Sequence, residues 1–389
     1  MGHLAGGKSG LTPLIDRLNH YPIGLVDSER LREILSLLFD ETEAFVGACF
    51  PLHEATLEEL AGLTEMAPEQ LLPVLERMAD KGLVMDMPFA GTTYYLLVPG
   101  LIGFMEFTFM RRRSDLPLGD LARLMTEYLE ENGKAGQAGE FFGSRSQLTR
   151  ALVYEEQIPV SSQVTSYEDA RQIILDADYC AITLCYCRHK KEHLGLACRK
   201  GAPVEGICMV LGEGARFLVR RGFAQERDKA SMLETLTHAR ALGLTHVTDN
   251  VREQPSFLCN CCRCCCELMA GVQLGFSDGI AKTPFLAEID AQRCDYCGAC
   301  LKACNVKCIG LAPTARRSPS DARFAAVDPA VCLGCGACVS VCEREAISLR
   351  ERPQRPKPPK TRGQLFARIL WEKGRIWPFV LDRARRWLP

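Results

Sequence analysis

The chain has 389 residues, of which 47% are hydrophobic and 24% charged, a composition typical of a globular protein with two or three domains. The apolar stretch 96–110 is too short to cross a bilayer and contains Glu106, so we expect no membrane-spanning segment. Cysteine is the exception to this ordinary composition: there are 21, and all but Cys49 lie between Cys180 and Cys342. The start of the chain lacks a secretory signal pattern, so we expect a cytoplasmic protein whose thiols bind metal rather than form disulfides.

The N-terminal third has the periodicity of helices followed by a hairpin. Apolar residues recur at helical spacing in 28–38, and a helix–turn–helix pattern is followed by a predicted hairpin, over 55–63, 68–81, 83–85 and 92–98. We therefore predict an N-terminal segment (1–27) and a winged-helix-like domain (28–130). The second helix of the pair has no surplus of basic side chains, so we expect a docking or structural role rather than DNA binding.

The middle of the chain is predicted to be a linker followed by a cysteine-rich α/β unit. Glycine is frequent in 131–145, which favours a linker over 131–166. From 167 to 280, helical and extended patterns alternate, with helices expected at 168–177 and 230–242 and extended segments at 180–187, 208–211, 246–250 and 256–259. Together with the segments on either side, this pattern predicts an α+β protein.

Two copies of one pattern follow, at 285–311 and 323–349, and indicate a duplicated unit within a domain at 281–349. Each copy contains C-x2-C-x2-C-x3-C, a spacing that suits iron better than structural zinc. In two-cluster units the fourth cysteine of one copy binds the cluster of the other. The expected ligand sets are therefore Cys294, Cys297, Cys300 and Cys342 for one [4Fe–4S] cluster, and Cys332, Cys335, Cys338 and Cys304 for the other. We expect Gly298 and Gly336 to let the loop backbone approach each cluster.

These two quartets resemble those of bacterial-type ferredoxins, over residues 285–349. The resemblance implies an α+β unit with flanking strands, two [4Fe–4S] clusters and transfer of single electrons. Two features depart from the family pattern. Asn305 and Glu343 replace the proline that usually follows the fourth cysteine, and Cys308 stands where the second copy has Ala346, with a role that the sequence leaves open.

Besides Cys49 and Cys180, ten further cysteines lie upstream of the duplicated unit, from Cys185 to Cys266. Neighbouring cysteines point in different directions and cannot all pack as inert core, so we expect at least one more cluster, of the [4Fe–4S] type. Its candidate ligands are Cys185, Cys187, Cys198, Cys208, Cys259, Cys261, Cys262, Cys264 and Cys266, while the role of Cys265 stays open. His189 and His193 lie among charged residues and are expected at the surface.

The segments CYCRHKK and FLCNCCRCCCELMAGV, with single cysteines at 198 and 208, resemble a family of winged-helix and 4Fe–4S-binding proteins of anaerobes, over about 28–349. The resemblance implies electron transfer through 4Fe–4S clusters, without a defined reaction.

Residues 350–389 form a basic tail, with twelve Lys and Arg against three acidic residues. A proline-rich linker precedes an apolar stripe that holds all three tryptophans and is interrupted at Pro378. Such a stripe is typical of an interfacial membrane helix, and equally of a helix packed on this chain or on a partner subunit. We therefore keep open a peripheral position on the inner face of the membrane.

These features predict an iron–sulfur protein that relays single electrons between redox partner proteins, rather than a stand-alone enzyme. Two alternatives remain. The CNCCRCCC region (259–266) would hold a substrate-transforming cluster in a subunit of an anaerobic oxidoreductase, or the winged-helix-like domain would belong to a redox-sensing regulator.

Overall fold

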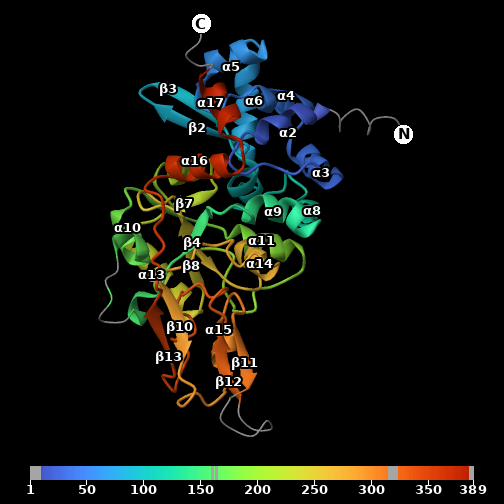
Figure 1. Ribbon diagram of the computed structural model, residues 1–389. Helices are drawn as coiled ribbons and strands as arrows, with labels where there is room; N and C mark the ends of the chain where they lie inside the picture. The colour runs from blue at the N-terminus through green and yellow to red at the C-terminus, as the bar shows by residue number, and fades with distance from the viewer. Residues whose placement is uncertain (1–9, 159–161, 163–164, 314–322, 385–389) are drawn as a thin grey trace.

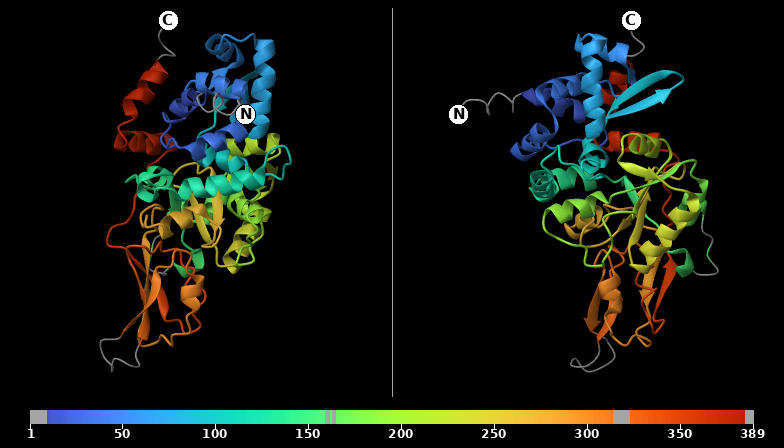
Figure 2. Two further views of the ribbon diagram at one scale, coloured as in Figure 1. Left: turned by 90° about the vertical axis from the view of Figure 1, so that its right-hand side faces the viewer. Right: turned by 180° about the vertical axis from the view of Figure 1, so that it is seen from behind.

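A computed structural model describes residues 10–158, 162, 165–313 and 323–384. The described chain is elongated, with helices of the N-terminal third at one end, a central sheet in the middle and the strands of the duplicated unit at the other end (Figure 1). The last two helices return to the N-terminal end, which both further views show (Figure 2). Segments distant in sequence therefore pack together at that end.

The N-terminal unit combines helices with a small antiparallel sheet of order β1-β3-β2. Capping boxes begin α4, through Asp40 and Glu43, and α5, through Thr56 and Glu59. Gly82 ends α6 in the left-handed conformation. The elements are α2 (Thr12–Leu18), α3 (Glu29–Leu38), α4 (Glu41–Cys49), β1 (Ala55–Thr56), α5 (Leu57–Thr64), α6 (Pro68–Lys81), β2 (Val84–Phe89) and β3 (Thr92–Leu97).

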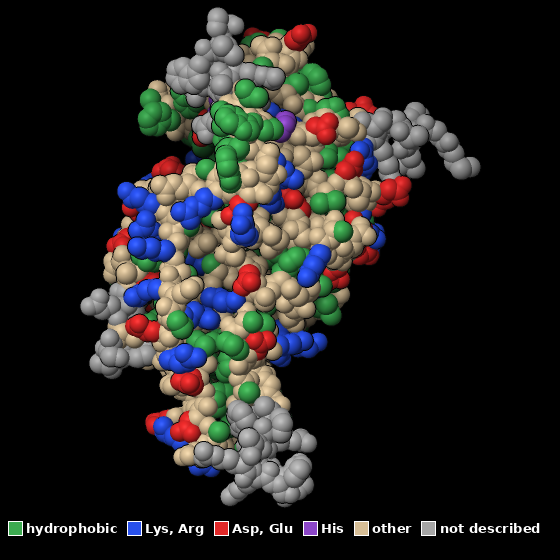
Figure 3. Space-filling model, viewed as in Figure 1, with side chains coloured by type: hydrophobic (Ala, Val, Ile, Leu, Met, Phe, Trp, Pro, Cys, Tyr) green, Lys and Arg blue, Asp and Glu red, His purple; other side chains and the backbone are tan. Residues whose placement is uncertain are grey.

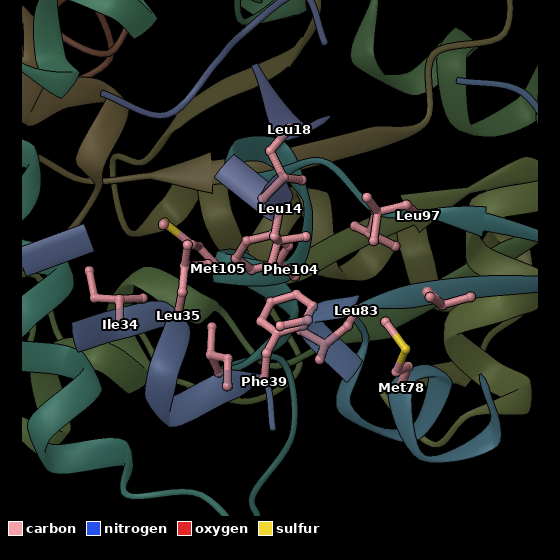
Figure 4. Close-up of a cluster of buried hydrophobic side chains, with 14 of the residues drawn as sticks. Leu14, Leu18, Ile34, Leu35, Phe39, Met78, Leu83, Leu97, Phe104 and Met105 are labelled. Carbon is pink, nitrogen blue, oxygen red and sulfur yellow. The ribbon is translucent and has the colours of Figure 1, made fainter. Parts of the chain in front are cut away.

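Apolar side chains from these helices and strands form one core, part of which Figure 4 shows. Leu14, Ile34 and Leu97 are fully buried there, although they come from three different elements. Burial of this shared apolar surface stabilises helices that are too short to persist alone in water.

A set of short helices leads from this unit to the central sheet. They are η1 (Gly100–Phe104), α7 (Met105–Phe107), α8 (Leu118–Glu130), η2 (Gly133–Ala135) and α9 (Gln137–Phe142). The stretch predicted as a linker, 131–166, contains α9 and the strand β4 (Thr149–Ala151). Ala138 and Phe142 are buried, so this glycine-rich stretch is packed into the body over much of its length.

The central sheet has six strands in the order β4-β8-β9-β6-β5-β7, and neighbouring strands in this order are antiparallel. This arrangement differs from the α/β unit expected from the sequence and makes the unit α+β. Its strands after β4 are β5 (Cys180–Thr183), β6 (Cys208–Leu211), β7 (Ala224–Glu226), β8 (Thr245–Asp249) and β9 (Phe257–Cys261). Its helices are η3 (Glu155–Gln157), η4 (Ser166–Glu168), α10 (Ala170–Asp176), α11 (Tyr186–His193), α12 (Gly212–Arg220), α13 (Lys229–Ala241) and α14 (Glu267–Gln273).

The duplicated unit consists of β10 (Phe285–Ile289), α15 (Ala299–Ala303), β11 (Ile309–Pro313), β12 (Arg323–Val327) and β13 (Ile347–Glu351). β10 of the first copy pairs with β13 of the second, and β11 of the first pairs with β12 of the second. Equivalent hydrogen bonds recur in both halves: the Asp290 N–H donates to the carbonyl of Ala346, and the Asp328 N–H to that of Cys308. The two copies are therefore interlocked rather than side by side.

The tail forms α16 (Arg362–Glu372) and α17 (Ile376–Ala384). Leu365 and Ile369 of α16 are buried in a small apolar cluster with Ile23 and Val251. This part of the tail therefore packs on its own chain, one of the alternatives that the sequence left open. Within the described residues, the helices lack the combination of length and apolar character that a bilayer crossing requires.

Candidate metal centres

The duplicated unit contains two cysteine-lined cavities. The first has about 390 Å³ of space free of protein atoms, including space open to solvent, and its cysteines are Cys294, Cys297, Cys300 and Cys342. Three of these come from the first copy, and the fourth, Cys342, comes from the second. Cys297 is exposed, so this cavity lies close to solvent.

The second cavity, of about 360 Å³ measured in the same way, is lined by Cys304, Cys308, Cys332, Cys335 and Cys338. It faces the central sheet, because Thr245 of β8 also lines it and donates its hydroxyl to the Cys335 Sγ at 3.6 Å. Cys308, which the sequence left without a role, has its Sγ 3.5 Å from that of Cys304. Five thiols therefore surround this cavity.

Protonation of these thiols responds to burial and to neighbouring sulfur. Burial raises the pKa of Cys335 to about 11, while hydrogen bonds from Cys308 lower the pKa values of Cys304 and Cys332 to about 6. Metal ligation requires thiolates, so iron binding at Cys335 would release a proton near neutral pH.

Glycines shape the loops at both cavities. Gly298 and Gly336 adopt φ values of 74° and 86°, a left-handed conformation that favours glycine. A side chain on Gly298 would meet no described atom within 4 Å, so its requirement for glycine is conformational. At Gly334, which sequence reasoning missed, φ is 73° and an added Cβ would collide with the backbone carbonyl of Phe285.

The ten cysteines between Cys185 and Cys266 separate into two groups. The first, which we call the six-thiol group, is Cys185, Cys187, Cys208, Cys259, Cys261 and Cys266. Cys185 directly precedes α11, Cys208 begins β6, and Cys266 directly precedes α14. The Cys266 thiol contacts the Cys261 Sγ at 3.2 Å. Burial and the neighbouring thiols of Cys185 and Cys266 raise the pKa of Cys187, and the neighbouring thiols of Cys185 and Cys259 raise that of Cys208.

The alternating direction of side chains along β9 explains why Asn260 stands between Cys259 and Cys261. Successive side chains of a strand point to opposite faces, so Cys259 and Cys261 share one face and Asn260 lies on the other. The Asn260 side chain is buried and donates to the carbonyl of Ile207 at 2.7 Å, while its Oδ1 lies 2.6 Å from the His246 Nδ1. The Asn260 side chain therefore fixes the position of β9, the strand that carries two of the six thiols.

The second group, the four-thiol group, is Cys198, Cys262, Cys264 and Cys265. Their Sγ atoms all lie within 4.8 Å of one another. The Cys262 Sγ is 3.6 Å from that of Cys198 and 3.5 Å from that of Cys264. Cys265 belongs here although the sequence gave no reason to include it, because ligand spacing within a run of cysteines does not reveal which side chains converge.

A buried guanidinium lies between the two groups. Arg188 is 3% exposed, and its Nη2 donates to the carbonyl of Asn260 at 2.9 Å and to the Cys262 Sγ at 3.6 Å. Among the described atoms its Nε and Nη1 have no hydrogen-bond partner. Such buried donors are costly unless satisfied, and a sulfide-bearing cluster among these thiols would offer acceptors.

One prediction about the charged segment around His189 is wrong. His189, predicted at the surface, is 1% exposed, and its Nδ1 contacts the carbonyl of Phe109 at 2.8 Å, whereas His193 is exposed. Lys190 is also buried, forms an ion pair with Glu267, and lines a small cavity with Glu106. Burial raises the pKa of Glu106 to about 7 and lowers that of Lys190 to about 8. The sequence missed these buried residues because a run of charged side chains normally indicates an exposed helix face.

Comparison with known proteins identifies the duplicated unit. Residues 293–346 match the family described as a 4Fe-4S dicluster domain. No curated protein and no solved structure matches the chain. The chain therefore contains a ferredoxin-type 4Fe–4S module, and the thiols that line its two cavities are of the type that holds iron–sulfur clusters. When bound, such clusters supply one-electron redox chemistry.

Proposed function

We propose that this protein relays single electrons between redox partners through several [4Fe–4S] clusters, two in the duplicated unit and at least one in the six-thiol group. The proposal rests on the position of the second cavity, which lies in the same duplicated unit as the first cavity, with its exposed Cys297, and also borders the central sheet at Thr245. The first cavity offers an entry point near solvent through Cys297, and the second faces the sheet that carries the upstream cysteines.

The path from the second cavity to the six-thiol group is short. Thr245, whose hydroxyl contacts the Cys335 Sγ, is paired directly with Cys261 in the β8–β9 ladder. The Cα atoms of directly paired antiparallel residues are about 4.5–5.5 Å apart. One strand spacing therefore separates the second cavity from the backbone of the six-thiol group, and no large motion is needed between centres.

The proposed ligands follow from the cavities. Cys294, Cys297, Cys300 and Cys342 would hold the first cluster, and Cys304, Cys332, Cys335 and Cys338 the second, with Cys308 beside it. The six-thiol group offers more sulfurs than the four that a cubane uses. The Nε and Nη1 groups of Arg188, which have no hydrogen-bond partner among the described atoms, would donate to the thiolates and the cluster and offset their negative charge.

Anaerobic iron and acid-labile sulfide analysis, combined with EPR of the reduced protein, tests the proposal. We expect clearly more than about eight iron atoms per chain, since the duplicated unit alone accounts for two four-iron clusters. Cys187→Ser should remove one EPR signal and leave the ferredoxin-type signals, whereas Cys49→Ser on α4 should change neither. Eight or fewer irons in fully reconstituted protein would contradict the upstream cluster.

For the N-terminal unit we propose a structural or docking role. Glu76 and Asp80 of α6, the helix that would read DNA in a winged helix, both form ion pairs with Arg221. An acidic helix occupied in this way lacks the cations that neutralise phosphates. A salt-sensitive, nanomolar complex with one defined duplex, measured by fluorescence anisotropy, would contradict this role.

We further propose that the tail holds the protein against an anionic membrane face. Trp371 and Trp377 are 70% and 68% exposed, and Leu381 is 62% exposed. Figure 3 shows apolar side chains gathered over this end of the molecule, with Lys and Arg spread over the face beside them. Exposed tryptophans next to basic side chains are typical of an interfacial surface.

A further inference from the structure

We propose that the four-thiol group binds a single zinc ion, separate from the electron-transfer clusters, and that this ion fastens the ferredoxin-type unit to the central sheet. The group contains only cysteines, and they come from two segments without regular structure, 194–207 and 262–266. This site does not depend on the proposed electron relay.

The spacing of the sulfurs fits one ion. A tetrahedral ion with metal–sulfur bonds of about 2.3 Å has sulfurs about 3.8 Å apart along each edge. Among the four thiols, the Sγ–Sγ distances are 3.6 Å for Cys198–Cys262, 3.8 Å for Cys198–Cys264, 3.5 Å for Cys262–Cys264 and 3.8 Å for Cys264–Cys265. All four sulfurs can therefore reach one central point.

A cubane requires a different arrangement. Each of its four irons binds a different cysteine, so the sulfurs must lie at the outer corners, on the far sides of the iron atoms. The ferredoxin-type quartets meet this need by lining open cavities, as Cys294 and Cys342 do. All four sulfurs of the four-thiol group lie within 4.8 Å of one another, whereas no set of three or more described sulfurs in the six-thiol group converges in this way. The complete four-thiol set therefore fits one ion rather than the outer corners of a cubane.

The charge around the group suits a zinc–tetrathiolate site, whose net charge is negative. Arg188 donates to the Cys262 Sγ at 3.6 Å, and the backbone N–H of Arg199 donates to the Cys264 Sγ at 3.4 Å. Tetrahedral coordination by four sulfurs is typical of zinc or of iron–sulfur centres. A closed site that joins two loops is the structural use of zinc, which has no redox chemistry.

Contacts beside the group reach the ferredoxin-type unit directly. Lys200, two residues after Cys198, donates its Nζ to the carbonyls of Gly243 at 2.7 Å and Ala303 at 3.3 Å. The backbone N–H of Arg263 donates to the Oδ1 of Asn305 at 3.3 Å. Asn305 follows Cys304 of the second cavity, so an ion that orders residues 198–200 and 262–265 would also order the wall of that cavity.

The test uses the full-length protein purified anaerobically. We expect about one zinc per chain by elemental analysis, and zinc-edge X-ray absorption with four sulfurs at about 2.3 Å. Cys265→Ser and Cys198→Ser should each reduce bound zinc at least tenfold while iron and sulfide stay within a fifth of the wild-type value. Cys180→Ser, a buried cysteine on β5 outside both groups, should leave zinc and iron unchanged.

Zinc with fewer than three sulfur neighbours, or zinc that is unchanged in both variants, would overturn the proposal. A loss of about four irons per chain in Cys265→Ser would also overturn it, because the group would then hold a cluster. The absorption measurement on the unaltered protein decides the question even if a variant fails to fold. A negative zinc result with iron above eight would leave the electron relay standing.

Discussion

Replacing Glu140 by Gln is predicted to loosen the C-terminal helices from the body of the protein. The Glu140 Oε1 accepts hydrogen bonds from the Gly24 N–H at 2.8 Å, from the Lys373 Nζ at 2.7 Å and from the Arg375 Nη1 at 2.6 Å. The Glu140 and Lys373 side chains are 15% and 13% exposed, whereas Arg375 is 30% exposed. One carboxylate thus joins the N-terminal segment, α9 and the tail.

The magnitude follows from that partial burial. Removing one partner from a fully buried ion pair costs about 3–5 kcal/mol, and an exposed pair contributes about 0–1 kcal/mol. The site lies between these limits, and the amide of Gln can still accept one hydrogen bond. We therefore expect a loss of about 2 kcal/mol in docking of the tail, which is about a 30-fold rise in the population of the undocked state.

Hydrogen exchange of the α16 amides measures this effect without unfolding the whole chain. Exchange should become about 30-fold faster in Glu140→Gln, while Glu234→Gln, an exposed glutamate on α13, should leave it within about twofold. Unchanged exchange in Glu140→Gln would refute the reasoning and would mean that the apolar contacts of Leu365 and Ile369 alone hold the helix.

The same site should make docking depend on pH. Burial opposes ionisation of Glu140, but the hydrogen bonds from Arg375 and Lys373 outweigh it and lower its pKa. A carboxyl group with a lowered folded-state pKa stabilises above its unfolded pKa of about 4.3, and that stabilisation is lost as pH falls below this value. Exchange of α16 should therefore accelerate on acidification in the wild type, after correction for intrinsic rates, and show a smaller change in Glu140→Gln.

Three further predictions concern the clusters and the tail. Cys304→Ser should alter the EPR signal of the cluster built on Cys332, Cys335 and Cys338, and Cys342→Ser should alter that of the cluster in the first cavity. If each variant instead altered the cluster of its own copy, the predicted exchange of ligands would be wrong. Gly334→Ala should destabilise by roughly 3 kcal/mol or more in thermal denaturation, because its Cβ meets backbone, while Gly298→Ala should cost only about 1 kcal/mol; equal losses would contradict this. Trp371→Ala with Trp377→Ala should reduce co-sedimentation with anionic vesicles several-fold without changing iron content; wild-type protein that ignores vesicles and copurifies with a subunit through this surface would favour docking on a partner.

The sequence by itself predicted the module at 285–349, because the spacing of its cysteines is a local pattern and because the two copies can be aligned with each other. It also predicted the long helix 68–81 and the helix 230–242, which appear as α6 and α13, since apolar periodicity and caps act over a few residues. The pattern of two-cluster ferredoxins also predicts which cysteines share a cluster, and this exchange of fourth ligands stays a prediction that the Cys304→Ser and Cys342→Ser variants test.

Only the tertiary structure divided the upstream thiols into six and four, because Cys262 and Cys266 lie in one run and diverge where β9 ends and α14 begins. The burial of Arg188 and His189 also depends on the tertiary structure, because it depends on which face of α11 packs against the body of the protein. The same is true of α16, whose apolar side chains pack against Ile23 and Val251. Each of these outcomes depends on contacts between segments 64 or more residues apart, or on the direction of side chains in an irregular loop. Local pattern carries no information about such contacts, whereas packing of the whole chain selects one arrangement of them.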